Sequence, residues 1–149
     1  MKTSVPISTL LFQKGSKVWS IAPEATVFDA IKLMAEKNIG ALTVMSHGLL
    51  AGVFTERDYT RKIALAGKTS RETQVKEILS GKMVTVGPDE SIDSCMRLMT
   101  ENRVRHLPVV RNDEVQGIVS IGDLVNWIIS TQDATIAQME QYIAGGVTA

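Results

Sequence analysis

Two segments of the chain share one helical pattern of apolar residues. Apolar side chains recur every three or four positions in residues 27–34 and again in residues 92–99. This spacing places them on one face of an α-helix, which can pack against a core. A hydroxyl residue, Thr26 or Ser91, stands directly before each segment and can cap the first turn, and Asp29 can complete the cap at Thr26. The pattern therefore predicts two amphipathic helices that begin in the same way.

Short unbroken apolar runs follow each predicted helix. They occupy residues 41–45 and 49–54 after the first helix, and residues 107–110 and 115–119 after the second. Runs of this length suit strands that are buried on both faces, and the polar turns between them suit hairpins. We expect a second helix to begin after each hairpin, where Thr55 or Ser120 can serve as its cap.

Further short elements complete the prediction. A short strand is expected before the first helix of each set, at residues 19–21 and 84–86, and one helical turn is expected at residues 75–79. A separate C-terminal helix is expected within residues 131–149, from four apolar residues at helical spacing: Ile136, Met139, Tyr142 and Ile143.

The two halves of the chain are copies of one unit. At an offset of 65 residues, which aligns Pro23 with Pro88, residues 18–64 match residues 83–129 without a gap. The identical pairs include Leu33/Leu98, Met34/Met99, Glu36/Glu101, Leu42/Leu107, Val44/Val109, Gly52/Gly117 and Asp58/Asp123. An ungapped match in which the apolar positions coincide throughout indicates a duplication. The predicted organisation is an N-terminal segment (1–15), a first unit (16–66), a linker (67–74), a second unit (75–130) and a C-terminal helix with its tail (131–149).

Composition narrows the classes of function. A chain of 149 residues with 44% hydrophobic residues is long enough to bury a core. Its 16 basic and 16 acidic residues balance, so the net charge predicts neither a nucleic-acid partner nor an anionic membrane partner. No apolar run approaches the ~18 residues of a membrane span, and the interrupted N-terminus does not favour a signal peptide. The single cysteine, Cys95, cannot form an internal disulfide and favours a reducing, cytoplasmic setting.

One short motif occurs at the end of both predicted hairpins. The sequence reads GVFTERD at residues 52–58 and GIVSIGD at residues 117–123. A strand that turns directly into a helix leaves free backbone N–H groups at the helix start, which favour phosphate or other oxygens. The glycines, Gly52 and Gly117, would let a ligand approach the backbone closely because they have no Cβ.

The hydroxyl and the carboxylate of each motif are expected on one side of the first helical turn. Asp58 and Asp123 could each accept two hydrogen bonds from the vicinal hydroxyls of a ribose. Thr55 and Ser120 could contact the ribose or the first phosphate. The same residue types also cap helices for stability alone. Two copies at equivalent places favour ribose binding over a purely structural role.

The duplicated helix–strand–strand–helix unit with its Gly/hydroxyl/Asp motif resembles a CBS domain, the regulatory module of cystathionine-β-synthase. The likeness covers roughly residues 16–130 and includes IAPEATVFDAIKLM, VGPDESIDSCMRLM and VRHLPVV. It implies an α/β (α+β) fold of two pseudo-twofold-related units, each a small sheet with two packed helices, that form one module. Family members with two units and nothing else usually act as sensors that bind adenosine nucleotides.

The resemblance implies two clefts, each shared by both units. In one cleft Ser120 and Asp123 would hold a ribose, and the first unit would enclose the base with Ser20, Ile21, Ala22, Gly40 and Ala41. In the other cleft Thr55 and Asp58 would hold the ribose beside Thr85, Val86 and the strand start at Arg105, His106 and Leu107.

The two clefts are expected to differ in charge. Arg57 and Arg61 lie one helical turn apart at the helix start that would face the Asp123 cleft, whereas the matching residues of the second unit are Gly122 and Asn126. Because guanidinium groups pair bidentately with phosphate, we expect the Asp123 cleft to bind nucleotide phosphates more tightly.

Other residues carry weaker signals. Arg105 and His106 are candidates for phosphate contacts, although a histidine before a strand is often structural. Arg57 could instead pair with acids at the surface. Cys95 falls on the apolar face of its helix, which indicates core packing rather than a nucleophile.

Three classes of function follow from these observations. The first is a regulatory sensor that binds AMP, ADP, ATP or NAD and changes conformation to regulate another protein, which the sequence does not identify. The second is a structural dimerisation module without a physiological ligand. The third, an enzyme, is disfavoured because the sequence contains no recognisable catalytic pairing and no metal-spaced cluster. A homodimer is expected because several outward helical residues look too apolar for solvent: Phe28, Tyr59, Leu124 and Trp127, with the C-terminal apolar face.

Overall fold

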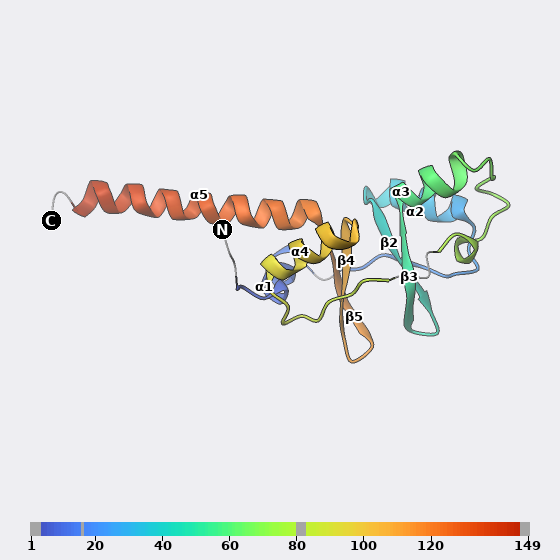
Figure 1. Cartoon of the computed structure of the whole chain (residues 1–149), viewed down its shortest axis with the longest axis horizontal. Coiled ribbons are helices and arrows are strands. Elements are labelled where there is room, and N and C mark those ends of the chain that lie inside the picture. The colour runs from blue at the N-terminus through green and yellow to red at the C-terminus, as the bar shows by residue number, and fades with distance from the viewer. Residues whose placement is uncertain (1–3, 16, 80–82, 147–149) are drawn as a thin grey trace.

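The computed structural model contains two similar units followed by one long helix (Figure 1). It describes residues 4–15, 17–79 and 83–146, and within the last helix the side chains of residues 121–132, 136–141 and 143. The elements in chain order are α1 (Ile7–Lys14), β1 (Ser20–Ile21), α2 (Val27–Lys37), β2 (Ala41–Ser46), β3 (Leu49–Thr55), α3 (Glu56–Tyr59), a π-helical turn (Thr60–Ala64), a 3-10 turn (Val75–Glu77), α4 (Ile92–Asn102), β4 (His106–Arg111), β5 (Glu114–Ser120) and α5 (Ile121–Gly146).

The two amphipathic helices, α2 and α4, form where the apolar spacing predicts them. Oγ1 of Thr26 accepts a hydrogen bond from the backbone N–H of Asp29 at 3.1 Å, and Oγ of Ser91 accepts one from Ser94 at 3.0 Å. These bonds satisfy N–H groups that the first helical turn leaves without a partner. The predicted caps of both helices are therefore confirmed.

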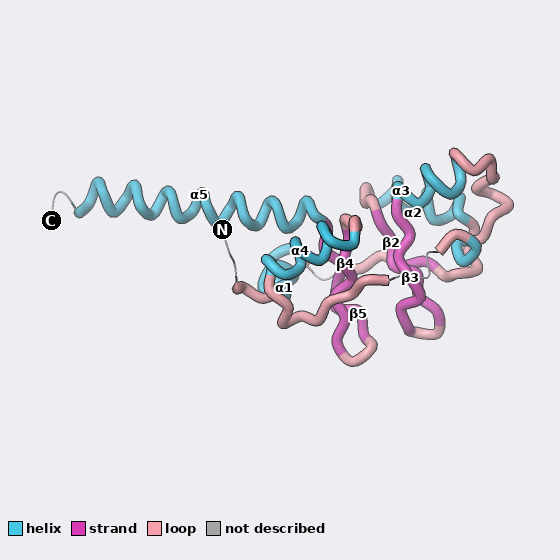
Figure 2. Tube along the Cα trace, in the orientation of Figure 1, coloured by secondary structure: helices cyan, strands magenta, loops and turns pink. Residues whose placement is uncertain are grey.

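The strands of the two units follow the same plan (Figure 2). In the first unit β1 runs parallel to β2, and β2 pairs antiparallel with β3. In the second unit β4 and β5 form the equivalent hairpin, and the expected leading strand at residues 84–86 is reduced to a parallel bridge between Val86 and Val109. Each hairpin has one register shift, after Val44 and after its repeat partner Val109. The duplication thus extends to the irregularities of the backbone.

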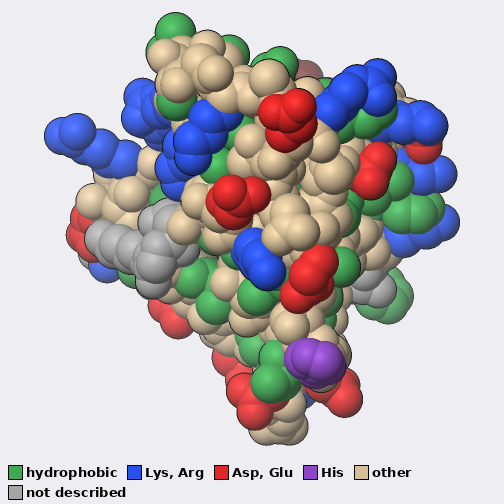
Figure 3. Space-filling model, turned by 90° about the vertical axis from the view of Figure 1, so that its right-hand side faces the viewer, with side chains coloured by type: hydrophobic (Ala, Val, Ile, Leu, Met, Phe, Trp, Pro, Cys, Tyr) green, Lys and Arg blue, Asp and Glu red, His purple; other side chains and the backbone are tan. Residues whose placement is uncertain are grey.

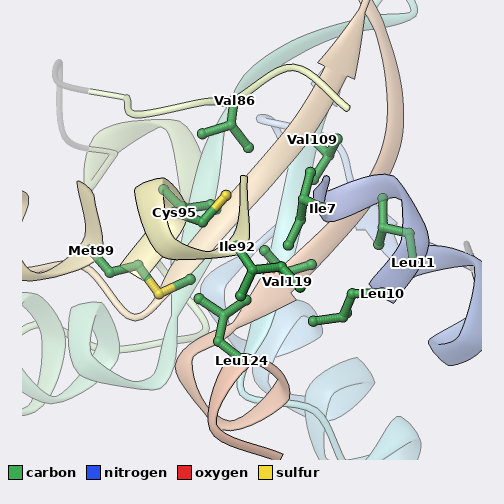
Figure 4. Packing of buried hydrophobic residues seen from close by; sticks show 11 residues of the cluster. Ile7, Leu10, Leu11, Val86, Ile92, Cys95, Met99, Val109, Val119 and Leu124 are labelled. Atoms are coloured by element: carbon green, nitrogen blue, oxygen red, sulfur yellow. The ribbon is translucent and has the colours of Figure 1, made fainter. Parts of the chain in front are cut away.

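Helix α1 belongs to the core of the second unit, although it precedes the first unit in the sequence. Ile7, Leu10 and Leu11 of α1 are buried against residues of α4, β5 and α5 (Figure 4). In Figure 4 the side chains of Ile7 and Leu10 point toward Val119. The sequence predicts that residues 1–15 lie outside the two units. It does not reveal the role of α1, because the contacts of its apolar face form only in the folded chain.

The first unit is completed in the same manner by residues 75–78, at the start of the stretch that the sequence assigns to the second unit. Val75 and Ile78 are buried in the first core. The backbone N–H of Val75 donates to Ala25 at 2.9 Å, and in the other unit the N–H of Ile7 donates to Glu90 at 2.7 Å. Each core therefore takes a short segment from outside its own repeat, which ties the two units into one module.

The last helix is continuous across the boundary expected at residue 131. Helix α5 runs from Ile121 to Gly146, and no glycine or proline interrupts residues 123–144. The prediction of a separate C-terminal helix is therefore wrong, because nothing in this stretch breaks the backbone pattern. The first turns pack on the second unit and the remainder extends away from the body (Figure 1). Among the described residues, no helix has both the length and the hydropathy needed to cross a bilayer.

The residues expected on an outward apolar surface take part in the packing of their own unit. Leu124 is fully buried in the second core and Trp127 packs against it, whereas Tyr59 packs against the first core. The ring of Phe28 lies under the guanidinium group of Arg71, 3.8 Å from the ring centroid. Leu124 is therefore not available for a dimer surface, whereas Phe28, Tyr59 and Trp127 remain partly exposed.

Candidate functional site

A pocket of about 520 Å³ lies between the two units. The first unit contributes the end of β3 together with α3 and the π-helical turn, and the second unit contributes the loop between α4 and β4. The pocket is lined by Gly40, Gly52, Val53, Thr55, Glu56, Arg57, Asp58, Arg61, Lys62, Met83, Val84, Asn102, Arg103, Val104, Arg105, His106 and Pro108. Its volume is within the range of small-molecule sites.

The first Gly/hydroxyl/Asp motif borders this pocket through a reciprocal helix cap. Oγ1 of Thr55 accepts from the backbone N–H of Asp58 at 3.1 Å, and Oδ2 of Asp58 accepts from the backbone N–H of Thr55 at 3.0 Å. The other carboxylate oxygen, Oδ1, lies 3.7 Å from Nζ of Lys62. The capping function is thus present, and it fixes the orientation of a carboxylate that lines the pocket.

The pocket wall carries more positive than negative side chains. Five cationic residues line it, against the carboxylates of Glu56 and Asp58: Arg57, Arg61, Lys62, Arg103 and Arg105. Nη1 of Arg57 donates to the carbonyl of Arg103 at 3.1 Å, which links α3 to the loop of the second unit. Nζ of Lys62 donates to the carbonyl of Ile78 at 2.8 Å. The local excess of cations contrasts with the balanced charge of the chain, and in Figure 3 both signs of charge occur on the end face of the molecule.

The expected position of two arginines is wrong. Arg57 and Arg61 line the pocket that contains Thr55 and Asp58, and they do not line the cavity at Asp123. The expectation assumed that α3 faces the start of α5 across the repeat axis. Instead, α3 directs Arg57 to the loop after α4, where it meets Arg103. The excess of positive charge therefore lies in the pocket at Asp58, whereas it was expected beside Asp123.

The second motif meets a different environment. Ser120 and Asp123 form the same reciprocal cap, with bonds of 3.1 Å and 2.8 Å. In addition, Nζ of Lys14 lies 2.5 Å from Oδ2 of Asp123 and donates to the carbonyl of Ile118 at 2.8 Å. The cavity beside Asp123 has a volume of about 250 Å³, and α1 and α5 alone line it: Leu10, Gln13, Lys14, Asp123, Asn126, Trp127 and Ser130. No residue of the first unit reaches it, so it is not a cleft between units.

Two titrating groups near this second motif have altered pKa values. Partial burial alone would raise the pKa of Asp123, but hydrogen bonds from Lys14 and from the backbone of Ser120 hold it below its usual value. Burial, together with the positive charges of Lys14 and Arg105, lowers the pKa of His106, and the negative charge of Asp123 opposes this effect. The lowered pKa favours the neutral form of His106 at the wall of the larger pocket.

The two motif glycines approach leucine side chains of the segments that complete each core. A Cβ on Gly117 would lie 2.8 Å from Cδ2 of Leu11, and a Cβ on Gly52 would lie 3.2 Å from Cδ2 of Leu79. Gly52 also lines the pocket, whereas Gly117 does not. The close approach expected for a ligand is thus made by the protein itself, most tightly at Gly117.

Most residues expected around the base lie away from the pocket. Gly40 lines it, and a Cβ there would be 3.8 Å from Nε2 of His106. The hydroxyl of Ser20 lies 2.6 Å from that of Thr43 within the sheet. The others are core or exterior residues: Ile21 packs on the first core, Ala41 is buried, Val86 and Leu107 are buried in the second core, and Ala22 and Thr85 are exposed.

Several residues of the site were not expected from the sequence. Lys62 follows Asp58 by four residues, a spacing that places two side chains on one side of a helix, so this pair could have been predicted. Arg103 has a left-handed backbone, with φ of 54°, at the end of α4, as does its repeat partner Asn38 at the end of α2. Lys14 gave no signal, because its contact with Asp123 depends on where α1 packs.

Groups suited to catalysis are sparse. The described residues contain no group of three or more His, Cys, Asp or Glu side chains that could hold a metal ion. Cys95 is buried, and this burial, with the nearby charge of Glu90, raises the pKa of its thiol to about 11. A thiol with this pKa is protonated at neutral pH and is a poor nucleophile.

The sequence of this chain is similar to those of several known proteins. The chain is 41% identical over 137 residues to the CBS domain-containing protein CBSX3, mitochondrial, of Arabidopsis thaliana, which covers 89% of this chain and 66% of the relative. The chain therefore spans just under two thirds of that relative. It is 32% identical over 119 residues to the CBS domain-containing protein YhcV of Bacillus subtilis (strain 168), covering 80% of this chain and 84% of the relative.

Solved structures also match this chain, both in fold and in sequence. The crystal structure of the CBS domain NE2398 matches with a TM-score of 0.80 and 46% identity, over 86% of this chain and 98% of the other. A CBS-domain protein of Burkholderia ambifaria MC40-6 that is named for signal transduction matches with a TM-score of 0.82 and 44% identity, over 86% and 96% of the two chains. The family model described as "CBS domain" matches residues 15–65 and 75–130. The chain belongs to the CBS domain family, of which it carries two domains in tandem.

Proposed function

We propose that the pocket between the two CBS units binds an adenosine nucleotide, AMP, ADP, ATP or NAD, and that the chain acts as a non-catalytic regulatory sensor. The family and the relative named for signal transduction support a regulatory module in general. The choice of an adenosine ligand comes from the family resemblance, and the choice of this pocket comes from its geometry. The observation that carries the proposal is a pocket that joins a fixed carboxylate to an excess of cations.

The cationic wall suits the phosphates of such a ligand. Arg61 and Arg105 are exposed, come from different units and line the same pocket. Guanidinium groups form paired hydrogen bonds to phosphate oxygens and stay charged at every physiological pH. A phosphate between them would contact both units at once. Ligand binding would then favour one relative arrangement of the units, which is how a ligand shifts a conformational population.

The fixed carboxylate suits the ribose. Oδ2 of Asp58 is used by the helix cap, whereas Oδ1 has a long contact with Lys62 at 3.7 Å. Oδ1 can therefore accept a hydrogen bond from a ribose hydroxyl without loss of the cap. Because the cap already orders the side chain, binding costs little additional conformational entropy.

The second motif provides a matched control for this proposal. Asp58 and Asp123 hold equivalent caps, but only Asp58 lines the larger pocket. The side-chain oxygen of asparagine can accept the same hydrogen bond from the backbone N–H of Thr55 or Ser120, so Asp58→Asn and Asp123→Asn should both fold. Calorimetric titration with AMP, ADP, ATP and NAD should show a loss of affinity of about tenfold or more for Asp58→Asn, and little loss for Asp123→Asn.

A thermal-shift assay supplies the simpler first test. A nucleotide that binds the native chain and is present at about 100 times its dissociation constant should add ~2.7 kcal/mol of stability. This corresponds to a rise in Tm of several degrees for a chain of this size. If none of the four nucleotides raises the Tm, or if the two asparagine variants lose affinity equally, the proposed pocket is not the nucleotide site.

A further inference from the structure

The repeat should create two clefts of the same kind, but helix α1 stands at the second one. The pocket between the units has Asp58 of the first unit and Val84 of the second unit in its wall. At the offset of 65 residues their counterparts are Asp123 and Trp19, so a second cleft is expected between these two residues. The cavity beside Asp123 is instead lined by α1 and α5 alone. The difference therefore lies in what α1 brings to Asp123.

The last residue of α1, Lys14, contacts the second motif at two points. Its Nζ lies 2.5 Å from Oδ2 of Asp123 and donates to the carbonyl of Ile118 at 2.8 Å. Ile118 is the repeat counterpart of Val53, which lines the pocket at the first motif. The ammonium group of Lys14 therefore lies where a ligand of the second cleft would have to enter. It donates to the carboxylate of Asp123 as a ribose hydroxyl would.

The first motif also has a lysine beside its carboxylate, but this lysine leaves the pocket open. Nζ of Lys62 lies 3.7 Å from Oδ1 of Asp58, and it donates at 2.8 Å to the carbonyl of Ile78, on the segment that completes the first core. The residue of the first unit that corresponds to Lys14 is Leu79, which carries no charge. The first motif thus receives no ammonium group from the segment that completes its core, whereas the second motif does.

The first-unit side of the second cleft retains groups that suit a nucleotide. Nζ of Lys17 lies 4.5 Å from the ring centroid of Trp19, and Nζ of Lys37 lies 4.2 Å from it. Neither lysine forms a salt bridge with a described residue. An aromatic ring can stack on a base, and cations without acidic partners can attract phosphate. What the second cleft lacks is a carboxylate that is free to accept from a ribose.

The contact that occupies this carboxylate can be removed without loss of the fold. The side chains of Lys14 and Asp123 are both partly exposed, and ion pairs of this kind contribute little to stability because solvent screens them. The residues of α1 that hold it on the second core are Ile7, Leu10 and Leu11, which are buried. Loss of the ammonium group should therefore change the second cleft and leave α1 in place.

We propose that the side chain of Lys14 blocks the second cleft, so that the native chain binds one nucleotide and a chain without this ammonium group binds two. The inference rests on the proposed function, because it takes the ligand of the second cleft to be the same class of nucleotide. Lys14 contacts no ligand itself. It decides how many ligands the chain can hold by occupying Asp123.

The number of sites can be measured by calorimetric titration with AMP. The native chain should bind one AMP per chain, whereas Lys14→Ala should bind two. Lys14→Arg keeps a positive charge that can pair with Asp123, so it should bind one. The matched control is Lys32→Ala, at an exposed position of α2, which should also bind one.

The two tryptophans of the chain report which cleft is filled. Trp127 lines the cavity beside Asp123, the repeat places Trp19 in the second cleft, and neither lines the pocket at Asp58. AMP should therefore change the tryptophan fluorescence of Lys14→Ala much more than that of the native chain. The additional change should disappear in Lys14→Ala/Asp123→Asn, because the carboxylate that would bind the ribose has been replaced.

A variant of the first motif separates this inference from the proposed function. Asp58→Asn should lose most of its AMP binding, and Lys14→Ala/Asp58→Asn should regain one site, at Asp123. A native chain that binds no AMP would contradict the proposed pocket at Asp58, but a gain of one site in Lys14→Ala would still support the blocking role of Lys14. The inference is overturned if Lys14→Ala binds no more AMP than the native chain, or if the native chain already binds two.

Discussion

The side chain of Lys14 ties the first helix of the chain to the start of the last one. Its Nζ lies 2.5 Å from Oδ2 of Asp123 and 2.8 Å from the carbonyl of Ile118. Asp123 also accepts from the backbone N–H of Ser120 at 2.8 Å. One carboxylate thus holds α1, the end of β5 and the start of α5 together. The equivalent carboxylate, Asp58, instead faces the pocket between the units.

Removal of this ion pair should weaken the attachment of α1. The pair is partly exposed, with 37% of the Lys14 side chain and 24% of the Asp123 side chain accessible, so its effect is limited by solvent screening. Lys14→Met should lower the free energy of unfolding by roughly 1 kcal/mol or less, measured by urea titration. Lys32→Met, at an exposed position of α2, serves as the control. Equal changes in the two variants would show that the contact adds no stability.

Stability should depend on pH through His106. Burial, and then the positive charges of Lys14 and Arg105, lower the pKa of His106 from its ordinary value of 6.5. Between pH 6.5 and this lowered pKa, the unfolded chain binds a proton that the folded chain does not. The contribution of His106 is therefore fully present above pH 6.5 and is lost as the pH falls through the folded pKa.

The matched variants for this prediction each replace one of the two histidines of the chain. His106→Gln should flatten the decline in unfolding free energy below pH 6.5, whereas His47→Gln, in the exposed turn after β2, should keep it. Asp123 also has a lowered pKa, but its effect belongs to the acid range below its ordinary value of 3.8. A decline that persists unchanged in His106→Gln would assign the pH dependence to other groups.

The contact between Gly117 and Leu11 should limit what β5 can tolerate. A Cβ at residue 117 would lie 2.8 Å from Cδ2 of Leu11, which is itself buried. Gly117→Ala should therefore shift α1 and cost roughly 1–3 kcal/mol, while Gly52→Ala, with 3.2 Å to Leu79, should cost less. In a Leu11→Ala background the cost of Gly117→Ala should shrink, because the obstructing methyl groups are gone. Additive costs in this double-mutant cycle would show that Leu11 is not the cause.

The elements that sequence predicts well are those whose signals are local. Thr26 and Ser91 cap α2 and α4 because a hydroxyl residue before an apolar periodicity suits a helix start. The repeat offset of 65 residues then fixes equivalent places for the hairpins, and the register shifts after Val44 and Val109 obey the same offset. Because the two units align without a gap, each local inference about one unit also applies to the other. The fold could therefore be predicted from this single sequence.

The site could be predicted only in part, because it depends on contacts between distant segments. The pair Thr55 and Asp58 was expected and lines the pocket. The equivalent pair Ser120 and Asp123 has the same local geometry, and it differs only because α1 brings Lys14 to it from more than 100 residues away. Arg57 and Arg61 were assigned to the wrong cleft for the same reason. Periodicity predicts which side of a helix a residue occupies, but not what that side faces.

The cationic wall of the pocket should discriminate between ligands with and without phosphate. Arg61 lines the pocket and is exposed, so its replacement should leave the fold intact. Arg61→Ala should weaken AMP by about tenfold or more, the scale of one hydrogen bond to a charged group, and should leave adenosine binding nearly unchanged. Asp58→Asn, in contrast, should weaken both ligands, because the ribose is common to them.

The control for this comparison is an arginine outside the pocket. Arg97 pairs with Asp93 on α4 at 2.8 Å and does not line the pocket, so Arg97→Ala should bind AMP as the native chain does. Calorimetric titration at two salt concentrations would add a second readout, because the AMP affinity of the native chain should fall with salt more steeply than that of Arg61→Ala. If Arg61→Ala weakens AMP and adenosine equally, the arginine supports the pocket structurally and contacts no phosphate.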